Sequence, residues 1–221
     1  MLLAVDTSTA QIGLALYDGA QVIGEFTWRS SQRHTVELAP AVSDLLTRCT
    51  VKMDDITALA VALGPGSFTS LRVGLAFVKG LALARNIPVI GISTLDVLAA
   101  AQPESNLPLA VAIQAGRGRF AVGWYKSLGS HWQPQHEARV VSIEAMKDEV
   151  TSPCMMCGEF MDEDRHELMK NRLIQLAHPT NSVRRPAVLA ELAWMRLQNG
   201  SVDDAASLAP IYLHTVAPIE T

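Results

Sequence analysis

The sequence predicts an α/β fold built from two similar lobes. Short apolar runs that suit strands alternate with longer runs that suit helices, and the pattern restarts near the middle of the chain. The length of 221 residues lies between one typical domain and two, and a composition that is 49% apolar can fill a sizeable core. We therefore expect an N-terminal lobe at 1–101 and a C-terminal lobe at 109–221, joined by a linker at about 102–108.

The first half is expected to open with three strands and to continue with alternating helices and strands. Asp18-Gly19, between two strand-like runs, is typical of a hairpin turn. Leu38, Val42 and Leu45 recur at helical spacing and predict a helix. In chain order, the expected elements are strands at 2–5, 11–17 and 20–28, a helix at 35–49, a strand at 56–63, a helix at 68–85, a strand at 89–92 and a helix from Ser93 or Thr94 to Ala101.

The second half repeats this order of elements. Val5-Asp6 aligns with Ile113-Gln114 at the end of the opening strand of each half. Two copies of a βββαβαβα pattern indicate an internal duplication. In chain order, the expected elements are strands at 109–113, 119–125 and 132–141, a helix from Ser142, a strand around 155–157, a helix near 162–170, a strand at 173–177 and a helix from about Pro186 to Asn199-Gly200.

The most informative block of the chain is glycine-rich. Residues 64–74 read Gly-Pro-Gly-Ser-Phe-Thr-Ser-Leu-Arg-Val-Gly, between a predicted strand and a predicted helix. Backbone N–H groups can converge on an anion at such a turn. The block nevertheless lacks the Lys-Ser/Thr ending of a Walker loop and the glycine spacing of a dinucleotide-binding fingerprint. Its shape suggests phosphate, but the residues that handle phosphate are missing.

The charge balance and the apolar stretches limit the classes of function. A formal net charge of −4 has the wrong sign for a protein that binds nucleic acid on its own, so we expect another protein to hold any RNA. The first residues contain no basic n-region and no cleavage site, and the most apolar stretch, 71–84, is too short to span a membrane. We therefore expect a soluble, cytoplasmic protein.

The cysteines do not indicate a metal or disulfide site. Their number, three, argues against a disulfide framework. Cys154 and Cys157 form a C-x-x-C pair, but no second pair follows at the spacing of a zinc ribbon. We expect both thiols to lie on a buried strand as small hydrophobic side chains.

An opening strand that ends in Asp6-Thr7-Ser8-Thr9, together with the duplicated halves, resembles the actin/hexokinase/Hsp70 nucleotide-binding fold. Two further blocks are more specific. They are Gly-Pro-Gly-Ser-Phe-Thr at 64–69 with Leu-Arg-Val-Gly at 71–74, and Lys-Gly-Leu-Ala at 79–82 with Pro-Val-Ile-Gly-Ile-Ser-Thr-Leu at 88–95. These blocks resemble the TsaB (YeaZ) family of bacterial subunits for tRNA threonylcarbamoyladenosine biosynthesis. The resemblance covers residues 2–98.

This resemblance implies a non-catalytic subunit that binds and activates a larger paralogue, a TsaD-like transferase. The paralogue transfers the threonylcarbamoyl group to the adenosine beside the anticodon of tRNA, and a small TsaE-like ATPase joins the pair. ATP and metal are then expected in the partner subunits, with none bound by this chain and with tRNA reached only through the complex. Without its partner, the chain is expected to form a homodimer.

The resemblance also singles out Asp6, Thr7, Ser8 and Gln114 as a vestigial nucleotide site. In kinases of this fold, the aspartate that corresponds to Asp6 positions a metal-bound water or a phosphate, and a second aspartate opens the second lobe. Gln114 stands at that second position, where a neutral amide cannot supply the missing carboxylate charge. A structural interpretation stays open, in which Asp6 hydrogen-bonds the turn at 7–9.

A histidine-based metal site is not expected. The resemblance implies that the transferase paralogue binds its metal through a His-x-x-x-His pair, which places both rings on one helix face. In this chain Leu38 stands four residues after His34, so only one of the two histidines is present.

The helices at 35–49 and 68–85 are the expected contact surface for a partner or a second copy. The second helix carries only Arg72 and Lys79 as charges between positions 67 and 84, so it must be buried on more than one side. A sheet and a neighbouring helix could provide that burial, but the resemblance favours an interface. We expect a charge at Leu75 or Val42 to abolish partner binding and to leave the fold intact. The predicted interface residues are His34, Leu38, Val42, Leu45, Phe68, Leu71, Arg72, Leu75, Val78 and Lys79.

The sequence leaves two alternative functions, both enzymatic. An ATP-dependent kinase-like enzyme would use Asp6 as its metal-side carboxylate. A peptidase would need a nucleophile and a base, but the Gly-x-Ser-x-Gly pattern is absent because position 69 is threonine. Arg184-Arg185, before the last predicted helix, is interpreted as ordinary surface.

Overall fold

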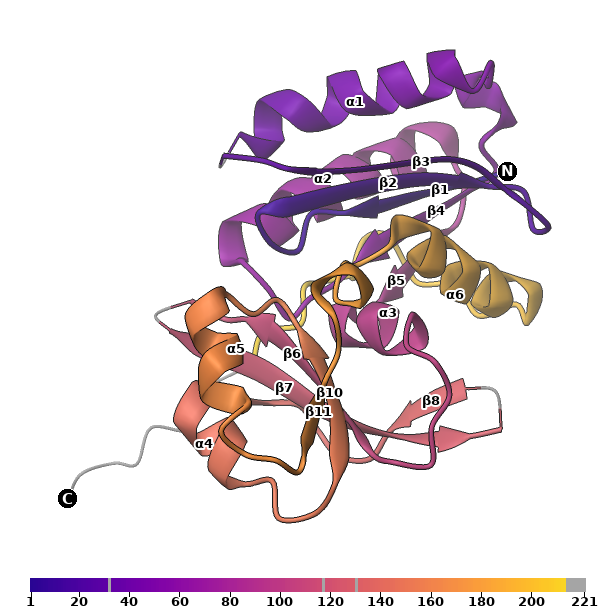
Figure 1. Cartoon of the computed structure of the whole chain (residues 1–221). Helices are drawn as coiled ribbons and strands as arrows, with labels where there is room; N and C mark the ends of the chain where they lie inside the picture. The colour runs from indigo at the N-terminus through magenta and orange to yellow at the C-terminus, as the bar shows by residue number, and fades with distance from the viewer. Residues whose placement is uncertain (32, 117, 130, 214–221) are drawn as a thin grey trace. The chain divides into compact units, whose positions relative to one another are not determined.

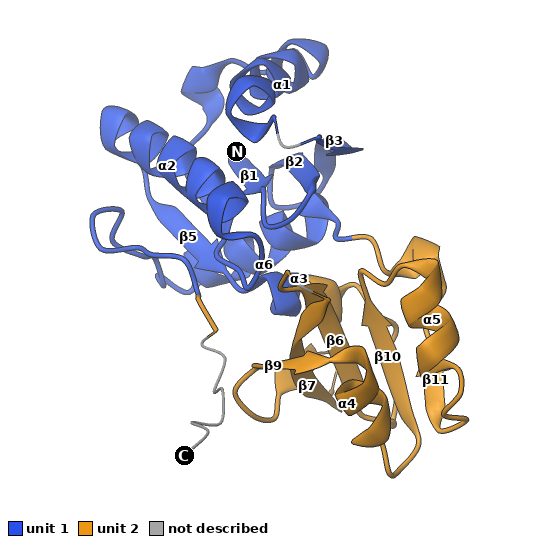
Figure 2. Cartoon of the chain, turned by 90° about the vertical axis from the view of Figure 1, so that its left-hand side faces the viewer, with its two compact units in different colours: residues 1–97, 184–211 blue, residues 98–183, 212–221 orange. Residues whose placement is uncertain are grey.

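The structure is a computed structural model that describes residues 1–31, 33–116, 118–129 and 131–213. It divides into two compact units, shown in Figure 2. Among the described residues, unit 1 contains 1–97 and 184–211, and unit 2 contains 98–183 and 212–213. Within the described ranges, no helix combines the length and the apolar character that a membrane crossing requires.

The chain returns to its first unit, and the sequence did not predict this return. Residues 184–211 were expected in the C-terminal lobe but belong to unit 1. The boundary along the chain falls within a helix, between 97 and 98, before the expected linker. The physical reason is helix α6 (Pro186–Gln198). Its Ala187, Leu189 and Ala190 are buried in one apolar cluster with Leu2 and Ala4 of the first strand.

Unit 1 contains a five-stranded mixed sheet in the order β3-β2-β1-β4-β5. Strand β1 pairs with β2 in antiparallel and with β4 in parallel orientation. The strands are β1 (Leu2–Asp6), β2 (Gln11–Tyr17), β3 (Val22–Arg29), β4 (Ala58–Ala62) and β5 (Val89–Ile92). The other elements are α1 (His34–Arg48), the short 3-10 helix Met53–Asp55, α2 (Phe68–Arg85) and α3 (Thr94–Ala100), which contains the boundary between the units along the chain.

Two apolar clusters cover the two faces of this sheet. Helices α1 and α2 lie on one face and α6 on the other (Figure 1). Because alternate residues of a strand point to opposite faces, Leu3 and Val5 pack with α1 and α2, whereas Leu2 and Ala4 pack with α6. The sheet is therefore a buried middle layer, and the polar end of β1 lies inside the unit.

Unit 2 repeats the strand order of unit 1, which confirms the predicted duplication. Its sheet has the order β11-β10-β6-β7-β8, and β9 also pairs with β7. Helices α4 and α5 cover one face of it. The elements are β6 (Leu109–Gln114), β7 (Arg119–Leu128), β8 (His131–Pro134), β9 (Arg139–Ser142), α4 (Ile143–Asp148), β10 (Cys154–Gly158), α5 (Asp162–Leu168), β11 (Ile174–Leu176) and the 3-10 turn Pro179–Asn181.

One predicted strand of unit 2 is wrong. Residues 132–141 were expected to form one strand, but the structure has two, which pair with successive parts of β7. Strand β8 pairs with 125–128 and ends at Pro134, and β9 pairs with 119–122. Proline carries no N–H to continue a ladder of hydrogen bonds, which is consistent with the break after it.

Two glycine substitutions in α2 should change stability in opposite directions. A Cβ added at Gly74 would lie 2.2 Å from Thr7 Oγ1, so Gly74→Ala should lower the free energy of unfolding by about 1–3 kcal/mol through overpacking. A Cβ added at Gly80 meets nothing within 4 Å, so Gly80→Ala should raise it by about 0.5–1 kcal/mol. Urea unfolding followed by circular dichroism measures both. A neutral or stabilising Gly74→Ala would contradict the close contact between α2 and Thr7.

Candidate functional site

The candidate site is the turn at residues 6–9, hereafter turn 6–9, which connects β1 to β2. All four residues are buried, and Ser8 is fully enclosed. A turn made of one carboxylate and three hydroxyl side chains can be buried only if its polar groups find partners. The contacts of this turn therefore decide whether it binds a ligand or packs against its own chain.

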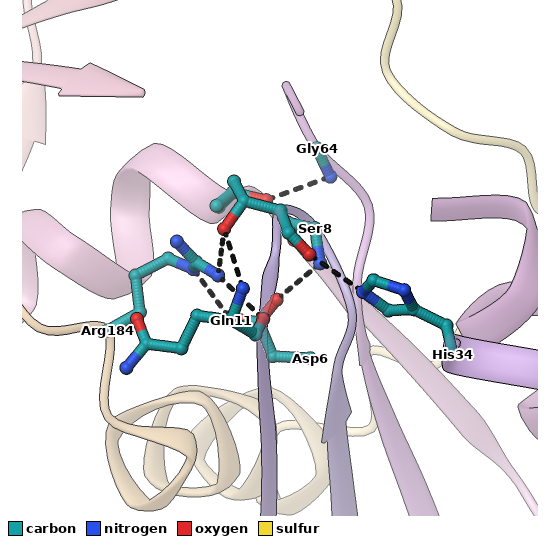
Figure 3. Close-up of polar contacts among 8 residues, drawn as sticks. Asp6, Ser8, Gln11, His34, Gly64 and Arg184 are labelled. Carbon is teal, nitrogen blue, oxygen red and sulfur yellow. Dashed lines mark hydrogen bonds and ion pairs between the residues drawn. The ribbon is translucent and has the colours of Figure 1, made fainter. Parts of the chain in front are cut away.

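Asp6 is occupied by two internal partners. Its Oδ1 accepts a hydrogen bond from Ser8 N at 2.8 Å, and its Oδ2 lies 2.8 Å from Nε of Arg184. The exposed fraction is 3% for the Asp6 side chain and 1% for Arg184. The guanidinium Nη2 also donates to Thr9 Oγ1 at 3.0 Å and to the carbonyl of Gln11 at 3.1 Å (Figure 3). Asp6 and Arg184 thus form a buried ion pair within unit 1.

Two sequence interpretations are decided by this geometry. The structural interpretation of Asp6 is confirmed, because its carboxylate accepts the Ser8 amide within the turn. The interpretation of Arg184 as ordinary surface is wrong, because Arg184 is 1% exposed and pairs with Asp6. No local pattern could have found this contact, since the two residues stand 178 positions apart. Arg185, next to it, does lie at the surface and pairs with Glu25.

The residues do not fit a metal–nucleotide complex at turn 6–9. Asp6 is already neutralised by a guanidinium, so it does not offer a free carboxylate to a divalent cation. Thr7 Oγ1 donates to the carbonyl of Ser70 at 2.7 Å, and Ser8 Oγ lies 2.8 Å from Thr94 Oγ1. Gln114 stands at the end of β6 in unit 2, where it is exposed.

The glycine-rich block packs against turn 6–9. The amide of Ser67 donates to the carbonyl of Ser8 at 2.7 Å, and the amide of Gly64 donates to Thr94 Oγ1 at 3.0 Å. A Cβ added at Gly66 would lie 2.1 Å from the Ser8 carbonyl oxygen. The glycines permit a close approach between the two backbone segments. The N–H groups of Ser67 and Gly64 donate to acceptors within the protein, so they do not point toward an anion.

His34 is the first residue of α1 and also contacts turn 6–9. Its ring is buried, and Nε2 lies 2.9 Å from the carbonyl oxygen of Thr9. Among the residues that the structure describes, no three His, Cys, Asp or Glu side chains gather as a metal site would require. The role that the geometry gives to His34 is to attach the start of α1 to the turn.

Helices α1 and α2 enclose an open groove of about 470 Å³ on the surface of unit 1. Most of its lining is apolar. Phe68 is 53% exposed, and the Arg72 guanidinium carbon lies 3.6 Å from the centre of its ring. The residues that line this α1/α2 groove are Thr35, Leu38, Ala39, Phe68, Thr69, Arg72, Val73, Ala76 and Phe77.

Most of the predicted interface residues are buried in unit 1, and one of them, Leu38, also lines the groove. Phe68 and Arg72 are exposed at the groove, and Lys79 donates from Nζ to the carbonyls of Ala206 and Leu208 at 3.0 Å. The interface itself stays a prediction. The buried residues are His34, Leu38, Val42, Leu45, Leu71, Leu75 and Val78.

One consequence of the interface prediction is wrong. Val42 is 2% exposed and Leu75 is 6% exposed, so a charge at either position would disrupt the core and could not leave the fold intact. Groove residues such as Ala39 and Ala76 were not among the predicted interface residues. A usable signal was present in α2, because Phe68, Arg72 and Ala76 recur every four residues and follow one stripe of the helix.

Cys154 and Cys157 lie on β10, as predicted, and both are buried. Burial raises the pKa of the Cys154 thiol to about 11 and that of Cys157 to about 12. Thiols of this kind react slowly, because the thiolate is the reactive form. The C-x-x-C pair is therefore explained by its place on a buried strand, where both thiols pack as small apolar side chains.

The buried thiols should be protected from thiol reagents in the folded chain. With a pKa near 11 or 12, roughly one molecule in a thousand or fewer carries either thiolate at pH 8. We expect Ellman's reagent to modify at most the half-buried Cys49 before unfolding and all three cysteines in urea. Fast modification of two or more thiols in the native protein would contradict this assignment.

Removing one charge of the buried ion pair should be costly. Asp6→Asn leaves the Arg184 charge inside unit 1 without its carboxylate, and should lower the free energy of unfolding by about 3–5 kcal/mol. The matched control is Arg185→Gln, whose side chain is 59% exposed and whose loss should cost at most about 1 kcal/mol. Urea unfolding of the two variants tests the difference. Equal losses would show that the buried pair is no stronger than a surface pair.

Comparison with known proteins connects this geometry to a family. The family of TsaD, the tRNA N6-adenosine threonylcarbamoyltransferase, matches residues 26–156, which is more than half of the chain. The tRNA threonylcarbamoyladenosine biosynthesis protein TsaB of Bacillus subtilis (strain 168) is 35% identical over 125 residues, or 57% of this chain and 55% of that protein. The matched part thus spans about half the length of this relative.

Solved structures extend the likeness to almost the whole chain. A Pseudomonas aeruginosa protein, described as similar to the peptidase YeaZ, has a TM-score of 0.80 and 28% identity, covering 96% of this chain and 99% of its own. Component A of (R)-2-hydroxyglutaryl-CoA dehydratase from Acidaminococcus fermentans has a TM-score of 0.53 and 10% identity, covering 89% and 98%. That second likeness concerns the fold alone, which is actin/hexokinase/Hsp70-like. The chain belongs to the TsaD family and, more narrowly, to its TsaB (YeaZ) members.

Proposed function

We propose that this chain is a non-catalytic subunit in the synthesis of threonylcarbamoyladenosine in tRNA. It binds and activates a TsaD-like transferase paralogue, which modifies the adenosine next to the anticodon. The observation that carries the proposal is the open, apolar α1/α2 groove. The biosynthetic role named for the Bacillus subtilis relative supports the choice of pathway.

The groove has the chemistry of a protein-binding surface. Exposed apolar side chains gather there, and such patches on soluble proteins mark contact sites. Phe68 and Arg72 stack on each other beside the groove, and aromatic and arginine side chains are enriched among the residues that dominate binding energy. The occupant is therefore a helical, apolar face of the transferase. A second copy of this chain takes its place when the transferase is absent.

The remaining partners follow from the same proposal. A small TsaE-like ATPase joins the pair, and the partner subunits supply ATP and metal. The net charge of −4 is unfavourable for direct contact with a polyanion, so tRNA is reached only through the complex. The complex works in the cytoplasm.

The two enzymatic alternatives lack support in the site. A kinase of this fold would use Asp6 for a metal ion, but Asp6 is paired with Arg184 in the interior. Ser67, the serine of the glycine-rich block, caps α2 by accepting hydrogen bonds from the amide and the hydroxyl of Ser70. Neither residue is arranged as a catalytic group.

A charge placed in the groove should weaken the transferase complex. Ala76 lines the groove and is exposed, so Ala76→Arg should fold normally and weaken binding of the purified TsaD-like paralogue at least tenfold, which is about 1.4 kcal/mol. Binding is measured by titration calorimetry, and single-turnover tRNA modification by the paralogue should fall in parallel.

The matched control is Ala84→Arg, which changes an exposed alanine of the same helix outside the groove lining. We expect its affinity to stay within about twofold of the unmodified chain. If both variants bind equally well, or both lose binding equally, the groove is not the contact surface. If the paralogue modifies tRNA at the same rate without this chain, the activating role is wrong.

A further inference from the structure

Turn 6–9 contacts the beginning of both groove helices. Thr9 presents its carbonyl oxygen to His34, the first residue of α1, at 2.9 Å. Ser8 accepts the amide of Ser67, the N-cap of α2, at 2.7 Å. Thr7 reaches the first turn of α2 as well, through its hydroxyl and the carbonyl of Ser70. The position of this one turn therefore fixes where α1 and α2 start.

Arg184 binds turn 6–9 from the opposite side to His34 (Figure 3). Its guanidinium donates to Oδ2 of Asp6, to Oγ1 of Thr9 and to the carbonyl of Gln11. These belong to the end of β1, to the turn and to the start of β2. Figure 3 shows the side chain of Arg184 reaching toward Asp6 and the turn, with His34 on the other side. The planar fork of donors lets one residue tie these segments together.

The groove includes the helix ends that the turn controls. Thr35 lies one residue after the start of α1, and Phe68 and Thr69 are the first residues of α2. A shift of the turn would move these residues relative to one another. Because a packed interface requires close complementarity, such a shift would be felt by any partner in the groove.

We propose that Arg184 is a positioning residue for the α1/α2 groove. It supplies, from within the chain, the positive charge that the buried carboxylate of Asp6 requires, and it sets the spacing of the two helix starts through turn 6–9. The partner-binding part of this inference rests on the proposed function, whereas the effect of Arg184 on the helix starts is independent of it.

Stability and positioning can be separated by removing both charges. Replacing a buried ion pair by neutral side chains is often neutral for stability, whereas removing one partner is not. The double variant Asp6→Asn/Arg184→Met keeps an amide oxygen that can accept the Ser8 amide, but it lacks the guanidinium that joins Asp6, Thr9 and Gln11. If Arg184 only stabilises, every property should recover in the double variant.

The decisive measurement is amide hydrogen exchange on the full chain, at the amide of Ser67. This amide bonds to turn 6–9, and the amide of Leu59, which donates to the carbonyl of Pro88, is the internal reference. We expect the double variant to unfold near the urea midpoint of the unmodified chain. Its Ser67 amide should exchange at least tenfold faster, with Leu59 unchanged. Affinity for the transferase should fall about tenfold as well.

The single variant Arg184→Met should show the same local effect together with lower stability, and Arg185→Met, at the exposed pair with Glu25, should show neither. Unchanged exchange at Ser67 in a stable double variant would overturn the inference. A failure of the unmodified chain to bind the transferase would overturn the proposed function alone, since the exchange result is read without a partner. If Arg184→Met does not fold, the double variant still decides.

Discussion

Asp6 and Arg184 stand 178 residues apart in the sequence, yet their charged groups meet at 2.8 Å inside unit 1. Burying a carboxylate or a guanidinium without its partner costs several kcal/mol of stability. The first strand and the segment that returns to unit 1 therefore stabilise each other through this pair. The contact comes directly before α6, whose apolar side covers the second face of the sheet. The ion pair therefore lies beside the helix that completes the three layers of unit 1.

The glycine-rich block takes its shape from the turn that this pair holds. Gly66 and Gly74 come so close to turn 6–9 that an added Cβ would lie within 2.2 Å of Ser8 or Thr7. Such contact allows the amide of Ser67 to bond the carbonyl of Ser8 and the Ser67 hydroxyl to cap α2. A loop that looks in sequence like an anion cradle thus serves as a joint between a strand end and a helix start. The resemblance to a phosphate loop is one of backbone shape.

The sequence predicted regular elements well where the local pattern was strong. Helix α2 and strand β5 have the predicted bounds, because a long apolar run after Ser67 and a short branched run between Pro88 and Ser93 are both local signals. The break between β8 and β9 was missed because it depends on which part of β7 each strand pairs with. The return of 184–211 to unit 1 was missed for a similar reason, since only the packing of α6 reveals it.

The candidate site shows the same limit at the level of side chains. The sequence alone identified Asp6 and the glycine-rich block, but no local pattern distinguishes the buried Arg184 from the exposed Arg185 next to it. Periodicity indicated that α2 is apolar on more than one side, but it could not say which side faces the sheet. In the structure Leu75 and Val78 face the core, whereas Ala76 and Phe77 line the groove.

The groove follows from this division of the two helices. Buried aliphatic residues of each helix, such as Leu45 and Val78, cover the sheet, and small residues such as Ala39 and Ala76 remain between the helices at the surface. Small side chains leave space that the aromatic rings of Phe68 and Phe77 border but do not fill. A helix pair that served only its own sheet would gain by closing this space with larger apolar side chains. The packing needs of unit 1 do not account for the open groove, which is the observation behind the proposed contact with another protein surface.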